Sequence, residues 1–331
     1  MKELIKRITE EYGPSGREGK IAEIIEKEIA PFVDEVKLDK LGSLIALKKG
    51  SGARVMLAAH MDEIGLIVTH IDKEGFLRFD VVGGVAAFRL TGLRVMFGNG
   101  LVGVIGAEKG DPASAGIDKL FIDIGATSKE DAESRVSIGD FAVFRQDFVD
   151  LGKRAIAKAM DDRIGCVVLI ETAKRLKSSP NEIHFVFTVQ EEVGLRGATA
   201  SAYAVDPDIG IALDVTRTGD LPESVTMDVS LGKGPAIKVK DSGIISSPKV
   251  KDLLVRIAKN LNIQYQLEIL LGGATDASSI EKARGGVPSG VISIPTRHLH
   301  TPSEMVDIDD VEDCVRLLTS TLEKDLRAEG F

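Results

Sequence analysis

The spacing of apolar residues along the chain predicts helices near both ends. Residues 2–12 and 16–30 are predicted to form two helices, because Ile21, Ile25 and Ile29 fall on one face of the second. Ser15 and Glu18 have the spacing of a capping box, which is typical of a helix start. Further helical patterns follow later in the chain, at 164–176, 250–261 and 311–322.

Between these helices lie short apolar runs that are rich in branched side chains. They span residues 54–59, 183–189, 209–213 and 291–294. Runs of this length bounded by charged residues, Gly or Pro are typical of buried strands. Strands that alternate with helices predict an α/β fold, with a mostly parallel sheet covered by helices on both faces.

The middle of the chain has a different pattern. From about residue 66 to about residue 153 it is dense in Val, Phe and Gly and shows little helical periodicity. Short strands joined by tight turns are therefore expected. We interpret residues 67–153 as a small β-barrel-like domain inserted into the α/β domain, which consists of residues 1–66 and 154–331. The alternative is that these strands extend the main sheet.

Composition narrows the choice of partners and compartment. The chain has 331 residues with 42 basic and 51 acidic side chains, a net charge of −9. No basic field exists to attract phosphates, so neither nucleic acid nor a membrane is expected as a partner. The N-terminus lacks the apolar stretch of a signal peptide, and two cysteines give no disulfide framework. We expect a cytoplasmic protein.

Each predicted strand is followed by a residue that can bind a metal ion. In an open α/β sheet these carboxyl ends meet at one edge, where ligands bind. Imidazole and carboxylate without thiolate suit zinc, cobalt or manganese. Two ions ~3.5–4 Å apart need about five side-chain ligands if one carboxylate bridges them. The predicted set is His60, Asp161, Glu192, Asp214 and His300.

Neighbouring residues have predicted supporting roles. Asp62 could orient the His60 imidazole, and Glu191 could act as general base and then as general acid. Both Glu191 and Glu192 can serve one centre only if the chain turns after the preceding strand. The glycine-rich turn at 272–277 is interpreted as a wall of the substrate pocket, with Gly272, Gly273, Thr275 and Asp276 as candidate contacts.

Two positions keep open alternatives. His298 and His300 compete for one ligand position; we favour His300, and His298 either lines the site or is structural. Arg217 either reaches an acidic substrate side chain or is an exposed loop residue.

The motifs together resemble the TET-type aminopeptidases, a family of cytosolic metallopeptidases with two metal ions. The resemblance covers nearly the whole chain and rests on six motifs in the family's order: HMDEIG (60–65), AMDDRIG (159–165), TVQEEVGLRGA (188–198), ALDVT (212–216), GGATDA (272–277) and IPTRHLHTPSEMVD (294–307).

The resemblance implies roles for individual residues. His60 and Asp214 would hold one metal, Glu192 and His300 the other, and Asp161 would bridge them. It also implies a cis peptide bond between Asp161 and Asp162, and a role for the inserted β-domain in dimerisation. Members commonly assemble as tetrahedral dodecamers.

We therefore expect a metal-dependent aminopeptidase that acts on peptides, with two zinc or cobalt ions, or manganese. Alternatives are a deacylase of N-acyl amino acids, a glycosidase using paired carboxylates, and a metal-stabilised assembly module. Ile64, Ile244, Ile245 and Leu271 leave room for an aliphatic pocket, so the expected preference is for neutral or aliphatic N-terminal residues.

Overall fold

Four parallel strands form the centre of a large mixed sheet in the computed structural model, which describes residues 1–109, 116–224 and 226–331. All four correspond to the predicted apolar runs, and each is buried over nearly its whole length. In spatial order they are β12 (Glu182–Thr188), β3 (Arg54–His60), β13 (Ile209–Thr216) and β16 (Ser289–Arg297).

Antiparallel strands extend the sheet on both sides of this centre. Two lie beyond β12: β2 (Leu44–Lys48) and β1 (Glu35–Leu38). Beyond β16 the order is β17 (Glu304–Asp307), β11 (Arg154–Ala157) and β10 (Val149–Asp150). A branch from β16 adds β14 (Ala236–Lys240) and then β15 (Gln266–Ile269). The prediction of a mostly parallel sheet therefore holds for the centre, and the edges make the sheet mixed.

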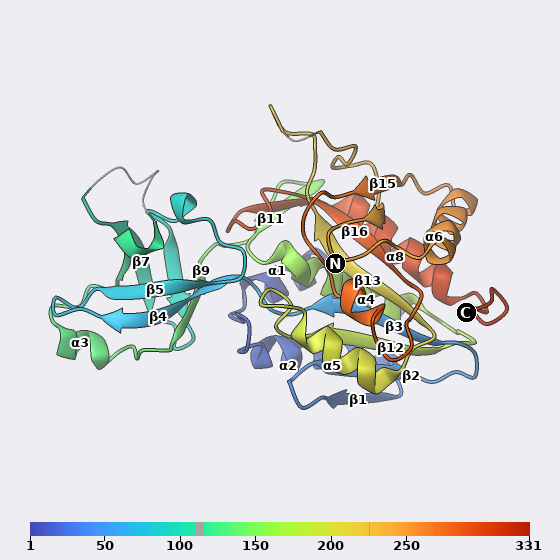
Figure 1. Ribbon diagram of the computed structural model, residues 1–331, viewed down its shortest axis with the longest axis horizontal. Helices are drawn as coiled ribbons and strands as arrows, with labels where there is room; N and C mark the ends of the chain where they lie inside the picture. The colour runs from blue at the N-terminus through green and yellow to red at the C-terminus, as the bar shows by residue number, and fades with distance from the viewer. Residues whose placement is uncertain (110–115, 225) are drawn as a thin grey trace.

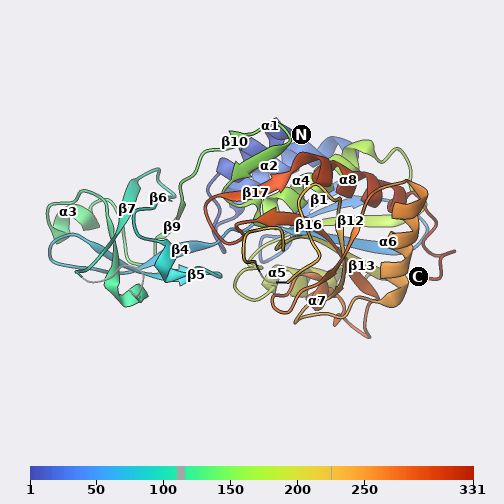
Figure 2. The same ribbon diagram turned by 90° about the horizontal axis from the view of Figure 1, so that it is seen from above.

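Helices cover both faces of the sheet, as Figure 2 shows. Apolar side chains of one helix group pack on one face, around a central helix, in the largest hydrophobic core. This group contains α1 (Lys2–Glu10), α2 (Gly19–Ile29), α4 (Met160–Arg175), α6 (Pro248–Asn260) and α8 (Ile308–Leu322). The opposite face carries α5 (Arg196–Val205) and α7 (Ala277–Ile280), whose apolar residues form a smaller core against β2, β3 and β12.

A closed antiparallel barrel projects from one end of the sheet (Figure 1). Its strands follow the order β4 (Gly65–Ile71), β5 (Leu77–Val82), β8 (Leu120–Asp123), β7 (Val102–Ala107), β6 (Arg94–Phe97) and β9 (Phe141–Phe144). The short helix α3 (Lys129–Glu133) belongs to the same segment, as do single 3-10 turns at Ala87–Arg89 and Ile117–Lys119; another lies at Ala30–Phe32. The barrel has its own hydrophobic core.

The α/β fold with an inserted β-barrel is thus confirmed. The division at residues 67–153 stays a prediction; the barrel strands run from Gly65 to Phe144, while β10 and β11 pair with the large sheet. Within the ranges that the structure describes, no helix is both long and apolar enough to cross a bilayer.

Candidate metal and catalytic centre

His60 and Asp161 meet at the carboxyl edge of the central strands. His60 is the last residue of β3 and is 2% exposed, and Asp161 lies at the start of α4 with backbone angles that are not helical. The peptide bond from Asp161 to Asp162 is cis, as the resemblance implies. His60 Nε2 lies 3.0 Å from Asp161 Oδ1. One carboxylate oxygen of Asp161 therefore faces an imidazole.

The other oxygen of Asp161 faces a second imidazole. His300 follows β16, and its Nε2 lies 3.2 Å from Asp161 Oδ2. His300 Nδ1 lies 2.8 Å from the carbonyl oxygen of Gly84, which can only accept, so Nδ1 donates and the ring presents Nε2 to Asp161. A Cβ on Gly84 would overlap the His300 ring, so this approach requires glycine.

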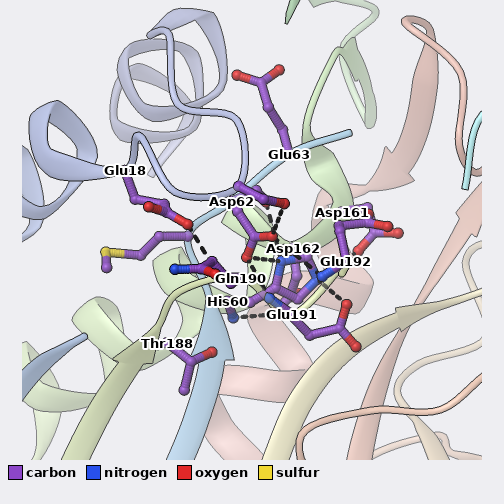
Figure 3. A network of polar contacts seen from close by, with 12 residues as sticks. Glu18, His60, Asp62, Glu63, Asp161, Asp162, Thr188, Gln190, Glu191 and Glu192 are labelled. Atoms are coloured by element: carbon purple, nitrogen blue, oxygen red, sulfur yellow. Dashed lines mark hydrogen bonds and ion pairs between the residues drawn. The ribbon is translucent and has the colours of Figure 1, made fainter. Parts of the chain in front are cut away.

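Asp62 organises the turn that carries the paired glutamates. Its carboxylate accepts the backbone N–H of Glu191 at 3.0 Å and that of Glu192 at 3.2 Å. The turn begins at Gln190, whose φ of 56° breaks the extended course of β12 (Figure 3). The turn expected after this strand is therefore present. His60 Nδ1 lies 3.1 Å from the backbone carbonyl oxygen of Asp62 and 3.4 Å from its carboxylate Oδ1.

Ser15 and Glu18 act differently from the prediction. Instead of forming a capping box, Ser15 Oγ donates to Asp62 at 2.6 Å, and Glu18 Oε1 accepts the backbone N–H of Gln190 at 3.0 Å. The capping-box prediction was wrong, because both side chains instead hold Asp62 and the turn that carries Glu191 and Glu192. Burial raises the pKa of Glu18 to about 7.

Two overlapping groups of side chains could each hold a metal ion. In each, the potential ligand atoms lie within 4.8 Å of one another; the groups are His60, Asp161 and Glu192, and His60, Asp162 and Asp214. Asp162 was not among the predicted ligands. Its two oxygens accept the backbone N–H groups of His60 and Gly165, both at 3.2 Å. His300 belongs to neither group, although its Nε2 lies 3.8 Å from Glu192 Oε1.

The carboxyl groups of the centre crowd one another away from water. Burial, and next the charge of Asp161, raises the pKa of Glu192 to about 7 and that of Asp214 well above its usual value. Burial likewise raises the pKa of Glu191, whose Oε2 lies 3.8 Å from His60 Nε2. Asp161 and Asp62 are exceptions: against the effect of burial, the His300 and His60 imidazoles keep the pKa of Asp161 below its usual range, and His60 and Ser15 lower that of Asp62. The cluster therefore needs positive charge to remain ionised.

A cavity of about 270 Å³ opens onto this centre. Residues of the centre line one side of it, among them His60, Asp161, Glu191 and Asp214. The rest of the lining is largely apolar and includes Val215, Met227, Ile269, Leu270, Leu271, Gly272, Gly273 and Thr275.

Most of the predicted pocket contacts lie on this wall, but not all of them. Asp276 does not line the cavity; it is buried, and its Oδ2 accepts the Thr188 hydroxyl at 2.5 Å. Of the four residues expected to form an aliphatic pocket, only Leu271 lines the observed cavity. Ile244 is buried in a small separate core, and Ile245 is 70% exposed.

Comparison with known proteins identifies the family. The M42 glutamyl aminopeptidase family matches residues 42–317. The chain belongs to this family. A putative aminopeptidase from Acetivibrio thermocellus is 52% identical over 324 residues, which cover 97% of this chain and 98% of the relative. The resemblance to TET-type aminopeptidases is thereby confirmed, and the protein is an aminopeptidase.

Solved structures agree with the family assignment. A TET aminopeptidase from a marine sediment archaeon, Thaumarchaeota archaeon SCGC AB-539-E09, superimposes with a TM-score of 0.94 at 39% identity, covering 99% of this chain and 98% of the other. The TET1 peptidase of Pyrococcus horikoshii, described as assembling into a tetrahedron or a large octahedral shell, gives 0.89 at 38% identity, covering 97% and 99%.

Glu304 is a residue of this M42 centre to which sequence reasoning gave no role. It lies at the start of β17, is 2% exposed, and its two oxygens accept the backbone N–H of Asp161 at 3.0 Å and that of His300 at 2.8 Å. One buried carboxylate thus fixes the backbone of both residues. The sequence did indicate that Glu304 lies near His300, because it follows His300 by four residues within the HTPSE motif.

A buried ion-pair network supports the centre from the side of α1. Glu63 Oε1 accepts from Arg163 Nη2 at 2.9 Å and from Lys158 Nζ at 2.8 Å, and all three side chains are at most 3% exposed. Figure 3 shows the Glu63 carboxylate pointing away from His60. Arg163 also donates to the carbonyl oxygen of Met61 at 3.1 Å. The network therefore ties the segment after β3 to the start of α4.

Lys158 gives this network a pH dependence that can be measured. Burial lowers the pKa of Lys158 to about 8, so between pH 8 and its usual pKa the unfolded chain binds more protons than the folded one. The free energy of unfolding should therefore rise with pH, by about 2 kcal/mol from pH 8 to pH 10. Denaturant unfolding of wild type and Lys158→Met at several pH values should show this rise in wild type only. An equal pH dependence in both proteins would contradict the assignment.

Proposed function

We propose that this M42 aminopeptidase removes N-terminal residues from peptides with two divalent metal ions, zinc or cobalt, or manganese. The observation that carries the proposal is the placement of Asp161, whose two oxygens lie 3.0 and 3.2 Å from the Nε2 atoms of His60 and His300. A carboxylate between two imidazoles can bridge two cations, with one imidazole on each.

The donor set fits such cations. His60, Asp161 and Asp214 would hold one ion, and Asp161, Glu192 and His300 the other. In the described part of the chain no donor reaches the buried Oε1 of Glu192, which leaves this oxygen available to a cation. We keep Asp161 rather than Asp162 as the shared ligand, because both oxygens of Asp162 already accept backbone N–H groups.

Side chains of the chain itself would perform the proton transfers. When bound, two divalent ions would polarise the scissile carbonyl group and lower the pKa of a water molecule between them. The Glu191 carboxylate would take a proton from that water and deliver it to the departing amine. Asp62, held by Ser15, would orient the His60 imidazole and fix the turn that carries Glu191.

We further propose a preference for neutral or aliphatic N-terminal residues, with Gly272, Gly273 and Thr275 as backbone and hydroxyl contacts. Apolar side chains form much of the cavity wall beyond the centre. The ammonium group of Lys238, which also lines the cavity, is already paired with Asp241 and Glu268, each at 3.0 Å. These pairs offset its charge, so it does not select an acidic side chain.

Assembly and location complete the proposal. Homo-oligomers are supported by the structural relatives, and we propose that dimers join through the barrel and build a tetrahedral dodecamer. Phe88, Val104 and Ile138 of the barrel segment are 59%, 44% and 62% exposed, which gives the barrel apolar surface that a partner copy could cover. A cytoplasmic location remains our expectation.

Metal removal tests the central proposal. Hydrolysis of leucyl-p-nitroanilide should be lost after dialysis against a chelator and return when zinc, cobalt or manganese is added back, because the carbonyl group would lack its electrophile. Rates measured with each metal on a panel of aminoacyl anilides would also test the aliphatic preference. Activity that survives complete metal removal would contradict the mechanism, and cleavage of N-acetyl-leucine alone would favour a deacylase.

Replacing Glu191 tests the proton transfer. Glu191→Gln keeps the size of the side chain but cannot accept the proton, so kcat should fall by a factor on the order of 10²–10⁴ while the metal content stays unchanged. Elemental analysis and anilide kinetics measure the two quantities. Glu74→Gln, at a side chain that is 53% exposed, is the control and should leave both unchanged. Near-normal turnover of Glu191→Gln would refute the role.

Replacing Glu304 tests whether this residue positions the proposed metal ligands Asp161 and His300. Glu304→Gln turns one acceptor into a donor that faces a backbone N–H, so metal affinity should fall by about 10- to 100-fold. Competition with a chelator measures this affinity.

Asp310 provides a matched control for Glu304. It is also buried, and its two oxygens accept the backbone N–H groups of Gly232 and Gly234, both at 2.7 Å. Asp310→Asn should lower thermal stability with little change in metal affinity. If both variants change metal affinity equally, Glu304 has only a general structural role.

A further inference from the structure

A second cavity, of about 620 Å³, adjoins the cavity of the metal and catalytic centre, and we name it the basic cavity. The two share Arg217 and Leu299 as lining residues. Arginine, histidine and hydroxyl side chains dominate the rest of the lining: Arg89, Arg297, His298, Thr218, Ser224, Thr296, Thr301 and Ser303, with Leu221. In the part of the chain that the structure describes, the lining contains no carboxylate.

Two of the three arginines that line the basic cavity have no carboxylate partner among the described residues. Arg297 forms a bidentate pair with Asp220, at 2.9 and 2.6 Å, which offsets its charge. Arg89 and Arg217 are exposed, and among the described residues neither forms a salt bridge. Arg89 instead lies over the ring of Phe88, 5.2 Å from its centre. The basic cavity is therefore positively charged, although the chain as a whole has a net charge of −9.

The basic cavity lies within reach of a substrate in the proposed centre. Arg217 is three residues beyond Asp214, and His298, Leu299 and Thr301 surround His300 in the chain. A peptide whose scissile bond lies at Asp161 and His300 can therefore extend past Arg217 into the basic cavity. His298, for which the sequence left two alternatives, lines this cavity and not the first one.

We propose that the basic cavity binds a carboxylate of the peptide substrate, with Arg217 as the main contact. This inference rests on the proposed aminopeptidase function. A guanidinium group presents parallel N–H donors that match the two oxygens of a carboxylate, and the hydroxyl groups of the lining supply further donors. The carboxylate is either the C-terminus of a short peptide or an acidic side chain. In the first case the enzyme favours short peptides with a free C-terminus.

The experiment compares substrates that differ only in this charge. Leucyl-leucine has a free carboxylate, whereas leucyl-leucinamide does not. For the metal-loaded enzyme, Arg217→Gln should lower kcat/KM for leucyl-leucine by about tenfold and that for the amide by less than about twofold. The control is Arg284→Gln, at an exposed arginine that stacks on Tyr203 outside both cavities; it should change neither value.

Further substrate pairs distinguish the two sources of the carboxylate. If an acidic side chain is bound, Arg217→Gln should selectively impair cleavage of Leu-Asp-NH₂ over that of Leu-Asn-NH₂. If the C-terminus is bound, only the free acid of leucyl-leucine should be affected. An equal effect of Arg217→Gln on the charged and uncharged members of every pair would overturn the proposal.

A binding measurement separates this inference from the proposed function. Calorimetry with metal-loaded Glu191→Gln should show tighter binding of leucyl-leucine than of leucyl-leucinamide, and the additional change Arg217→Gln should remove the difference. Equal affinities for the two peptides would overturn the role of the basic cavity alone. If the wild-type enzyme cleaves neither peptide nor leucyl anilide, the proposed function fails instead.

Discussion

Concentrated negative charge at the carboxyl edge of the central strands is the constraint on which the rest of the site depends. Carboxyl groups from β13, α4 and the start of β17 are buried there, next to the largely covered carboxyl groups of the turn after β12. Bringing them there raises the pKa of most of them, because water is excluded and like charges are close. Backbone N–H groups compensate part of this charge, at Asp62, Asp162 and Glu304. The imidazoles and the proposed cations account for the remainder.

The strand ends could be predicted from sequence because burial leaves a direct signal. Each central strand is a short run of branched apolar residues, and a parallel arrangement places all their carboxyl ends at one edge. Predicting His60 and Asp214 at that edge required only these two facts. The barrel was equally visible, since its strands lack helical periodicity and lie between the two parts of the α/β sequence.

The supporting contacts could not be predicted, because they join segments that are distant in the chain. Glu304 and Asp161 are 143 residues apart, and nothing in the local pattern around either indicates the hydrogen bond between them. Ser15 is a case in which a local rule gave a wrong prediction. Its spacing to Glu18 fits a capping box, but its hydroxyl group donates to Asp62, which is distant in the chain. Local rules describe what a residue can do when no distant group competes for it.

The hydrogen bond from His300 to Gly84 joins the barrel to the candidate metal centre. Gly84 follows the barrel strand β5, so the orientation of the imidazole depends on where the barrel lies relative to the sheet. Any contact that displaces the barrel must lengthen this bond or rotate the ring. By thermodynamic reciprocity, a cation held by His300 resists the same displacement to the same extent. If His300 holds a cation as proposed, the occupancy of that cation and the rigidity of the junction between the two parts of the molecule are linked in one equilibrium.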